Sequence, residues 1–213
     1  IYITHLSRPH RDHDRVHRII SSWPTCEDII LGGSVIVKSQ ITLTPLPSLK
    51  SITWDPMFSR SGDRVLPLLL ASSSDTLTHL KFDSCSMNLD LIATLSASLP
   101  LHLTSLAIGP VIDSYTPLYM DTILSRLTNL VTLNISKVYF ESFDWLLTAS
   151  SLRHVTFGRL DADLLEDLSS LLKRLHLSTL TIAASGVVYR ATKHSIIRIA
   201  KEAKITLIWD PRA

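Results

Sequence analysis

The stretch LTHLKFDSCSM, residues 77–87, decides the fold. Its apolar residues Leu77, Leu80 and Phe82 stand at relative positions −3, 0 and +2, with Leu80 taken as position 0. Apolar and polar residues alternate around position 0, which is the period of a half-buried strand. The stretch therefore predicts a short strand whose side chains at positions 0 and +2 point into a core.

The same spacing returns along the whole chain at intervals of 22 to 28 residues. A strand with its connecting segment cannot bury an apolar face alone, so neighbouring copies must stack. This predicts an α/β solenoid of about 7–9 repeats over residues 1–213 as a single domain, with a curved parallel sheet on the concave side and helices on the convex side. The position 0 residues are Ile29, Ile52, Leu80, Leu106, Leu133, Val155, Leu180 and Leu207, with Ile1 as a possible earlier member.

The segments between these strands show mostly helical apolar spacing. Helices are predicted over 64–73, 88–99, 117–127, 141–150, 161–175 and 192–204, and a closing strand over 205–210. Residues 32–48 alternate like a strand and contain Pro45 and Pro47, so this crossover is predicted to be extended.

The composition excludes several classes of protein. Apolar residues make up 46% of the chain, and the formal net charge of +2 lacks the basic excess of a nucleic-acid binder. The densest apolar run, 65–71, is too short to cross a bilayer, so no membrane association is expected. Cys26 and Cys85 form neither a disulfide framework nor a paired-cysteine zinc motif, which favours an intracellular location, cytoplasmic or nuclear. The chain begins at Ile1 rather than Met, and we expect it to belong to a longer protein.

The residues at 77–87 resemble a leucine-rich repeat of the form LxxLxLxxCxL, with Leu77, Leu80, Phe82, Cys85 and Met87 in its five positions. The other copies depart at the fourth position, where the family usually has Asn or Cys. The residues found there are Ser34, Met57, Val111, Val138, Leu160 and Ser185.

The long, irregular repeats and the opening LPSLKSITW (46–54) resemble the repeat region of fungal F-box-type proteins. That resemblance implies a non-catalytic interaction module, namely the target-recognition region of an F-box-like ubiquitin-ligase adaptor. One alternative is a generic leucine-rich-repeat scaffold in signalling or immunity. Another is a GTPase-activating protein that presents Arg60, Arg126 or Arg159 to a nucleotide.

No motif for catalysis or for a cofactor occurs in the sequence, so no catalytic residue, cofactor or metal is expected. We expect a monomeric solenoid that binds a protein partner of unknown identity. If position 0 faces the core, positions −1, +1 and +3 face outward on the concave side. The candidate partner-binding residues there are His79, Lys81, Asp83, Thr132, Asn134, Ser136, His154 and Thr156. The alternative is an ordinary solvated sheet face.

Two charged segments fall outside this pattern. In RPHRDHDRVHR (8–18), His10, His13 and His17 have the helical spacing of metal ligands, but four interleaved arginines would repel a cation. A solvated helix face, or a basic contact with an acidic partner, is the better interpretation. Residues 190–204 carry five cationic side chains against Glu202, and predict a helix with an exposed basic face that closes the solenoid. Contact with a nucleic acid or an anionic surface is the alternative there.

Overall fold

The computed structural model describes residues 2–3, 26–32, 48–55, 65–83, 95–109, 120–136, 140, 142–158, 160, 162–183 and 190–210. In this part of the chain, nine strands form one all-parallel sheet whose strand order follows the chain order. The strands are β1 (Tyr2–Ile3), β2 (Asp28–Gly32), β3 (Ser51–Asp55), β4 (His79–Phe82), β5 (Ser105–Ile108), β6 (Thr132–Ile135), β7 (His154–Phe157), β8 (Thr179–Ala183) and β9 (Thr206–Asp210).

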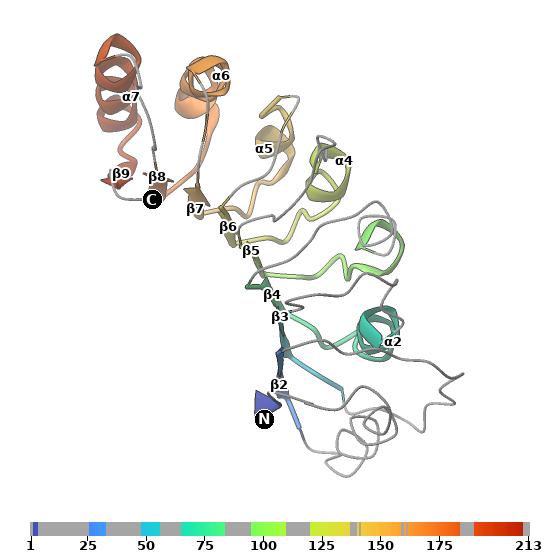
Figure 1. The fold of residues 1–213 in the computed structure, drawn as a ribbon. Coiled ribbons are helices and arrows are strands. Elements are labelled where there is room, and N and C mark those ends of the chain that lie inside the picture. Colours follow the sequence, from blue (N-terminus) through green and yellow to red (C-terminus); the bar gives the residue numbers. More distant parts are fainter. Residues whose placement is uncertain are drawn as a thin grey trace.

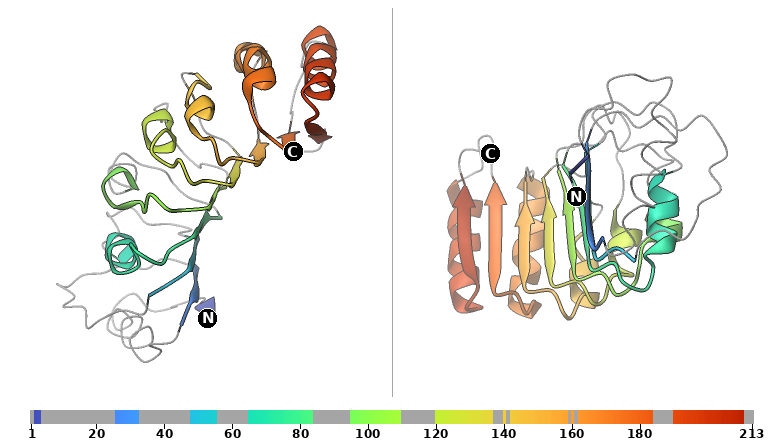
Figure 2. Two further views of the ribbon diagram at one scale, coloured as in Figure 1. Left: turned by 180° about the vertical axis from the view of Figure 1, so that it is seen from behind. Right: turned by 90° about the horizontal axis from the view of Figure 1, so that it is seen from below.

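The sheet curves, and the described helices fan out along its convex side (Figure 1). The right-hand view in Figure 2 looks onto the strands with the helices behind them. The helices are α2 (Val65–Ser72), α4 (Asp121–Leu124), α5 (Trp145–Thr148), α6 (Ala162–Leu171), the 3-10 turn η1 (Leu172–Arg174) and α7 (Arg190–Glu202). This confirms an α/β protein with one parallel sheet, arranged as in a solenoid.

The register confirms the predicted position 0 in strands β2 to β9. Ile29 pairs with Ile52, and the same pairing continues through the six following strands to Leu207. In β1, Tyr2 pairs with Ile30. Ile1, the possible earlier position 0, lies outside the described residues.

The core lies between the sheet and the helices. Side chains at positions 0 and +2 of β3 to β8 are buried, and those at positions −1 and +1 are exposed or half-buried. Phe82 and Phe157, both at position +2, are completely buried. Helical residues such as Leu69 and Leu168 close the core from the other side.

Two helices are shorter than predicted. The segments 117–127 and 141–150 contribute only the single turns α4 and α5 among the described residues. The Ser125 hydroxyl donates to the Thr122 carbonyl just after α4, and the Thr148 hydroxyl donates to the Trp145 carbonyl in α5. These hydroxyls offer the last carbonyls a partner other than a further helical turn. The longer predictions at 64–73, 161–175 and 192–204 differ from α2, α6 with η1, and α7 by one or two residues at each end.

The carbonyl at position −2 ties each strand to the next one. The Thr104 carbonyl accepts the amides of both Val131 and Thr132, at 2.8 and 3.0 Å. The same double acceptance recurs at Glu27, Lys50, Thr78, Val131 and Arg153. The start of each strand is therefore held by the strand before it.

Ser73 is the one polar side chain that is fully buried among the described residues. Its hydroxyl oxygen accepts the Leu49 amide at 3.2 Å, and the Thr76 hydroxyl donates to the Leu49 carbonyl at 2.9 Å. The turn after α2 thereby supplies hydrogen-bond partners for both the amide and the carbonyl of Leu49, shortly before β3 begins.

We expect Ser73→Ala to lower the free energy of unfolding by about 1–3 kcal/mol, because the buried Leu49 amide loses its acceptor. Urea denaturation followed by circular dichroism measures the change. Ser72→Ala is the matched control, since Ser72 is exposed and only donates to the Leu69 carbonyl of its own helix. Equal effects of the two substitutions would contradict the role given to Ser73.

Several predictions lie outside the described residues. These are the histidine segment 8–18, nearly all of the crossover 32–48, residues 88–94 of one predicted helix, and Cys85. Cys26 is a half-buried free thiol that donates to the Asp28 carbonyl.

Candidate functional site

The concave face consists of the side chains at positions −1, +1 and +3 of the strands. Because the strands are in register, these side chains form three rows that cross the sheet. Neighbouring strands lie about 4.8 Å apart, so the rows make a regular lattice. The position −1 row contains Ser51, His79, Ser105, Thr132, His154 and Thr179, and the position +1 row contains Thr53, Lys81, Ala107, Asn134, Thr156 and Thr181.

The eight predicted site residues all lie on this face. His79, Lys81, Asn134 and His154 are exposed, and Asp83, Thr132, Ser136 and Thr156 are half-buried. The structure does not bring them into a single cluster. Three belong to β4 and the residue after it, and five belong to β6, the residue after it, and β7.

β5 separates the two groups. It contributes Ser105 and Ala107, followed by Gly109, which are the smallest side chains on the face. β4 and β6 are two strand spacings apart, or about 10 Å. The centre of the concave face is therefore a shallow strip along β5. The charged side chains of β4 and the residue after it lie on one side of this strip. The mostly hydroxyl and amide side chains of β6 and β7 lie on the other side.

Two of the position +3 residues that were predicted to face outward are buried. Gly158 and Ala183 are buried, at 8% exposure for Ala183. At Gly158 the reason is a close backbone approach, since a Cβ there would collide with the Ser136 carbonyl group. The same approach occurs between Gly109 and the Asp83 carbonyl. At Gly109 after β5 and Gly158 after β7, position +3 therefore adds backbone rather than a side chain to the face.

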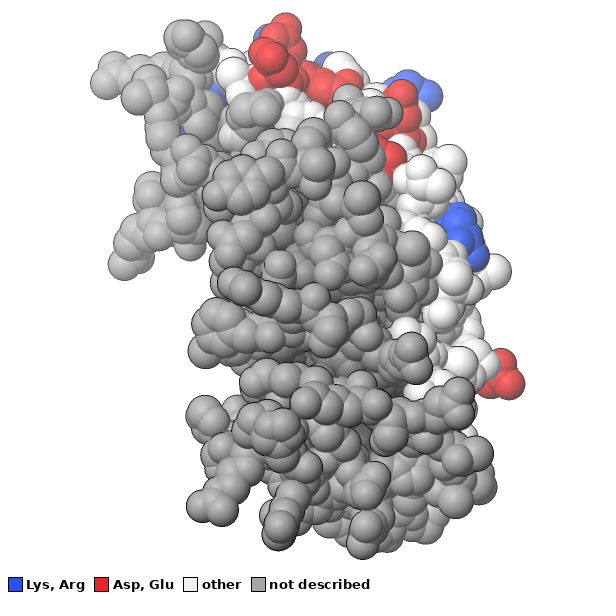
Figure 3. Space-filling view, turned by 45° about the vertical axis from the view of Figure 1, so that its right-hand side comes forward, with Lys and Arg blue, Asp and Glu red and all other residues white. Residues whose placement is uncertain are grey.

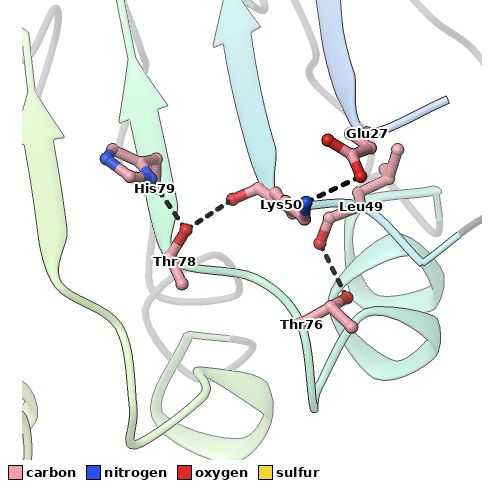
Figure 4. Close-up of polar contacts among 6 residues, drawn as sticks. All are labelled: Glu27, Leu49, Lys50, Thr76, Thr78 and His79. Atoms are coloured by element: carbon pink, nitrogen blue, oxygen red, sulfur yellow. Dashed lines mark hydrogen bonds and ion pairs between the residues drawn. The ribbon is translucent and has the colours of Figure 1, made fainter.

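The charged group on β4, which consists of His79, Lys81 and Asp83, makes polar contacts with nearby residues. Lys81 Nζ lies 2.5 Å from Asp83 Oδ1, and the two side chains are 54% and 39% exposed. Figure 4 shows the adjoining contacts at the start of the strands, where Thr78 Oγ1 lies 2.8 Å from His79 Nδ1 and donates to the Lys50 carbonyl. Lys50 Nζ in turn lies 2.7 Å from Glu27 Oε1.

Thr78 is a residue that the sequence analysis missed. It stands at position −2, outside the three rows, yet its hydroxyl contacts the His79 imidazole. The only signal in the sequence is a hydroxyl residue directly before the strand. By its contact with His79, Thr78 restricts how that ring is presented on the concave face.

Charges on the helical side differ from those on the concave face. The described acidic residues gather over the C-terminal helices in the view of Figure 3. The helix α6 contains Asp163, Glu166 and Asp167. Further along, the Lys173 ammonium group donates a hydrogen bond to Glu202 and attracts it, so that the pKa of this carboxyl is lower than its ordinary value. This ion pair joins η1 to α7.

Arg126, one of the arginines considered for a GTPase-activating role, lies in the turn after α4. Its guanidinium donates to the Ser96 carbonyl, so it is engaged within the chain on the helical side. Arg60 and Arg159 lie outside the described residues. In the part of the chain that the structure describes, no three His, Cys, Asp or Glu residues gather as metal ligands.

Comparisons with known proteins add no family. No protein-family model matches the chain, and no curated protein matches its sequence. Among the helices in the described ranges, none has the length and apolar character needed to cross a bilayer.

Proposed function

We propose that the chain is a non-catalytic module that binds a protein partner on its concave face. The supporting observation is an all-parallel sheet with one face free of described helices (Figures 1 and 2). Parallel sheets are usually covered on both faces. An uncovered, regularly spaced face is the natural place for a partner to bind.

The side chains on this face suit recognition through hydrogen bonds. Asn134 and Thr156 are in register on neighbouring strands, as are Thr132 and His154. Together they offer donors and acceptors about one strand spacing apart. The Lys81–Asp83 pair on the other side of β5 supplies charge that can fix the orientation of a partner.

We further propose that the repeats are leucine-rich repeats and that the parent protein is an F-box-like ubiquitin-ligase adaptor. The in-register series of position 0 residues supports the repeat assignment. The ligase assignment rests on the resemblance of the long, irregular repeats to those of fungal F-box-type proteins. A generic scaffold in signalling or immunity has the same face and differs only in what else it recruits.

Affinity purification of the full-length parent protein from its own cells tests both proposals when a concave-face variant is included. Asn134→Arg places a long cation in the middle of the face. We expect the recovery of target proteins to fall by about tenfold with this variant, as for loss of a contact worth about 1.4 kcal/mol. We expect a cullin and its adaptor to be recovered equally with both proteins.

Thr122→Arg on α4 is the matched control, because Thr122 is also exposed but lies on the convex side. It should leave every co-purifying protein at its original level. Loss of no partner with Asn134→Arg would refute binding on the concave face. Absence of a cullin from all samples would refute the ligase assignment and leave the scaffold alternative.

A further inference from the structure

The far end of the sheet differs from its interior. At positions 0 and +2, the side chains of β3 to β8 are buried, whereas Leu207 and Trp209 in β9 are only half-buried. On α7, Ile197 is 43% exposed. We name Leu207, Trp209 and Ile197, together with Lys193 and Lys204, the end face. Its apolar surface continues that of the core.

The backbone of β9 pairs with β8 on one of its two sides. In the inner strands, the amides at positions −1 and +3 point to the preceding strand, and the carbonyls at positions −2 and +2 point to the following strand. By the same alternation, the backbone groups of Leu207 and Trp209 point away from β8. In the described residues no strand lies on that side. Such an edge is a template for another strand.

A cation lies near each end of this edge. Lys193 Nζ sits 4.8 Å from the centre of the Trp209 ring. Lys204 directly precedes the residue that leads into β9 and is exposed. The span from Lys204 to Trp209 is about 17 Å for an extended chain. An added strand of similar length would bring its two ends near the two ammonium groups.

Lys204 occupies a conformation that favours glycine. Its φ is 59°, and it is the one non-glycine residue with positive φ among the described residues. The Ile205 amide donates to the Ala200 carbonyl and the Lys204 amide donates to the Lys201 carbonyl, which is the Schellman arrangement at a helix end. Glycine is the usual residue at this position because it has no Cβ to strain. A strained residue that persists points to a role beyond the turn.

We propose that the end face binds an extended, acidic segment of a partner protein, which adds to β9 as a further strand. Backbone hydrogen bonds to the edge supply affinity, and alternate apolar side chains cover Leu207 and Trp209. Acidic residues at both ends of the segment pair with Lys193 and Lys204. This surface is separate from the concave face, and the two proposals stand or fall independently.

A designed peptide tests the proposal with the 213-residue chain. The probe is acetyl-Asp-Thr-Leu-Thr-Ile-Thr-Asp-amide with a fluorophore, whose centre copies the alternation of β8. We expect saturable binding by fluorescence anisotropy, at least about tenfold tighter than for the same peptide with Lys in place of both Asp residues. Affinity should fall as salt rises. Replacement of the central Thr with Pro should abolish binding, because Pro removes a backbone donor.

Lys204→Gly separates a structural role from a binding role. We expect this variant to melt at a higher temperature than the natural protein, because the positive φ costs glycine nothing. We expect the same variant to bind the acidic probe roughly threefold more weakly, as does Lys193→Gln. Lys50→Gln, whose partner is Glu27 at the other end of the sheet, is the control and should leave binding unchanged. Equal affinity for the two peptides, no saturable binding, or unchanged affinity of Lys204→Gly would overturn the proposal.

Discussion

Phe157→Ala is expected to lower the free energy of unfolding by about 3–5 kcal/mol. Phe157 stands at position +2 of β7 and is completely buried. Its ring centre lies 4.9 Å from that of Phe143 and 5.8 Å from that of Phe140. Truncation removes these ring contacts and leaves a cavity that the parallel strands on either side cannot close. Urea denaturation followed by circular dichroism measures the loss.

The neighbouring residue supplies the control for this substitution. Thr156 precedes Phe157 but points to the concave face, so Thr156→Ala should change stability by less than about 0.5 kcal/mol. If Phe157→Ala does not fold, Phe157→Leu keeps part of the volume and should show a smaller loss in the same direction. Similar effects at the two neighbouring positions would mean that the register of β7 is wrong.

The register was predictable because one spacing repeats in every copy. A strand has a side-chain period of two, so a slip by one residue would expose Leu80 and Phe82 together. Eight copies with apolar residues at positions 0 and +2 leave one consistent alignment. The eight candidate site residues followed from this alignment alone, and all of them lie on the concave face.

Other features depend on contacts between copies, which a single repeat does not contain. Ser73 resembles any other serine until the turn after α2 is placed against Leu49, which is 24 residues away in sequence. Leu207 is half-buried, although its sequence position matches that of the inner strands, because among the described residues no strand pairs with β9 on the side away from β8. The contact of Thr78 with His79 likewise depends on how the −2 position is held by Lys50.

The position +3 row shows why local pattern fails at the end of a strand. The sequence places Ser136 and Gly158 at equivalent positions, but only the structure shows that the backbones approach closely there. Alternation predicts direction while the strand is regular. Alternation gives no information on the distance to the backbone of the neighbouring strand.

Gly158→Ala is expected to destabilise the protein by about 3 kcal/mol, although it adds only one methyl group. The Gly158 amide donates to the Ile135 carbonyl at 2.6 Å, so the two strands are already close. An added Cβ would collide with the Ser136 carbonyl group. This obstacle is backbone and cannot rotate away, so β6 and β7 must separate and weaken that hydrogen bond.

Ala183→Gly provides the matched control, because Ala183 holds position +3 of β8 and already carries a Cβ in the native sheet. It should cost only about 0.5–1 kcal/mol, through the greater freedom of the unfolded chain. Gly109→Ala meets the same obstacle at the Asp83 carbonyl and should match Gly158→Ala in size. Since the two glycines are about 10 Å apart across the sheet, their effects should add in the double variant. Full stability of either alanine variant in urea denaturation would show that the strands are further apart at this edge than the structure places them.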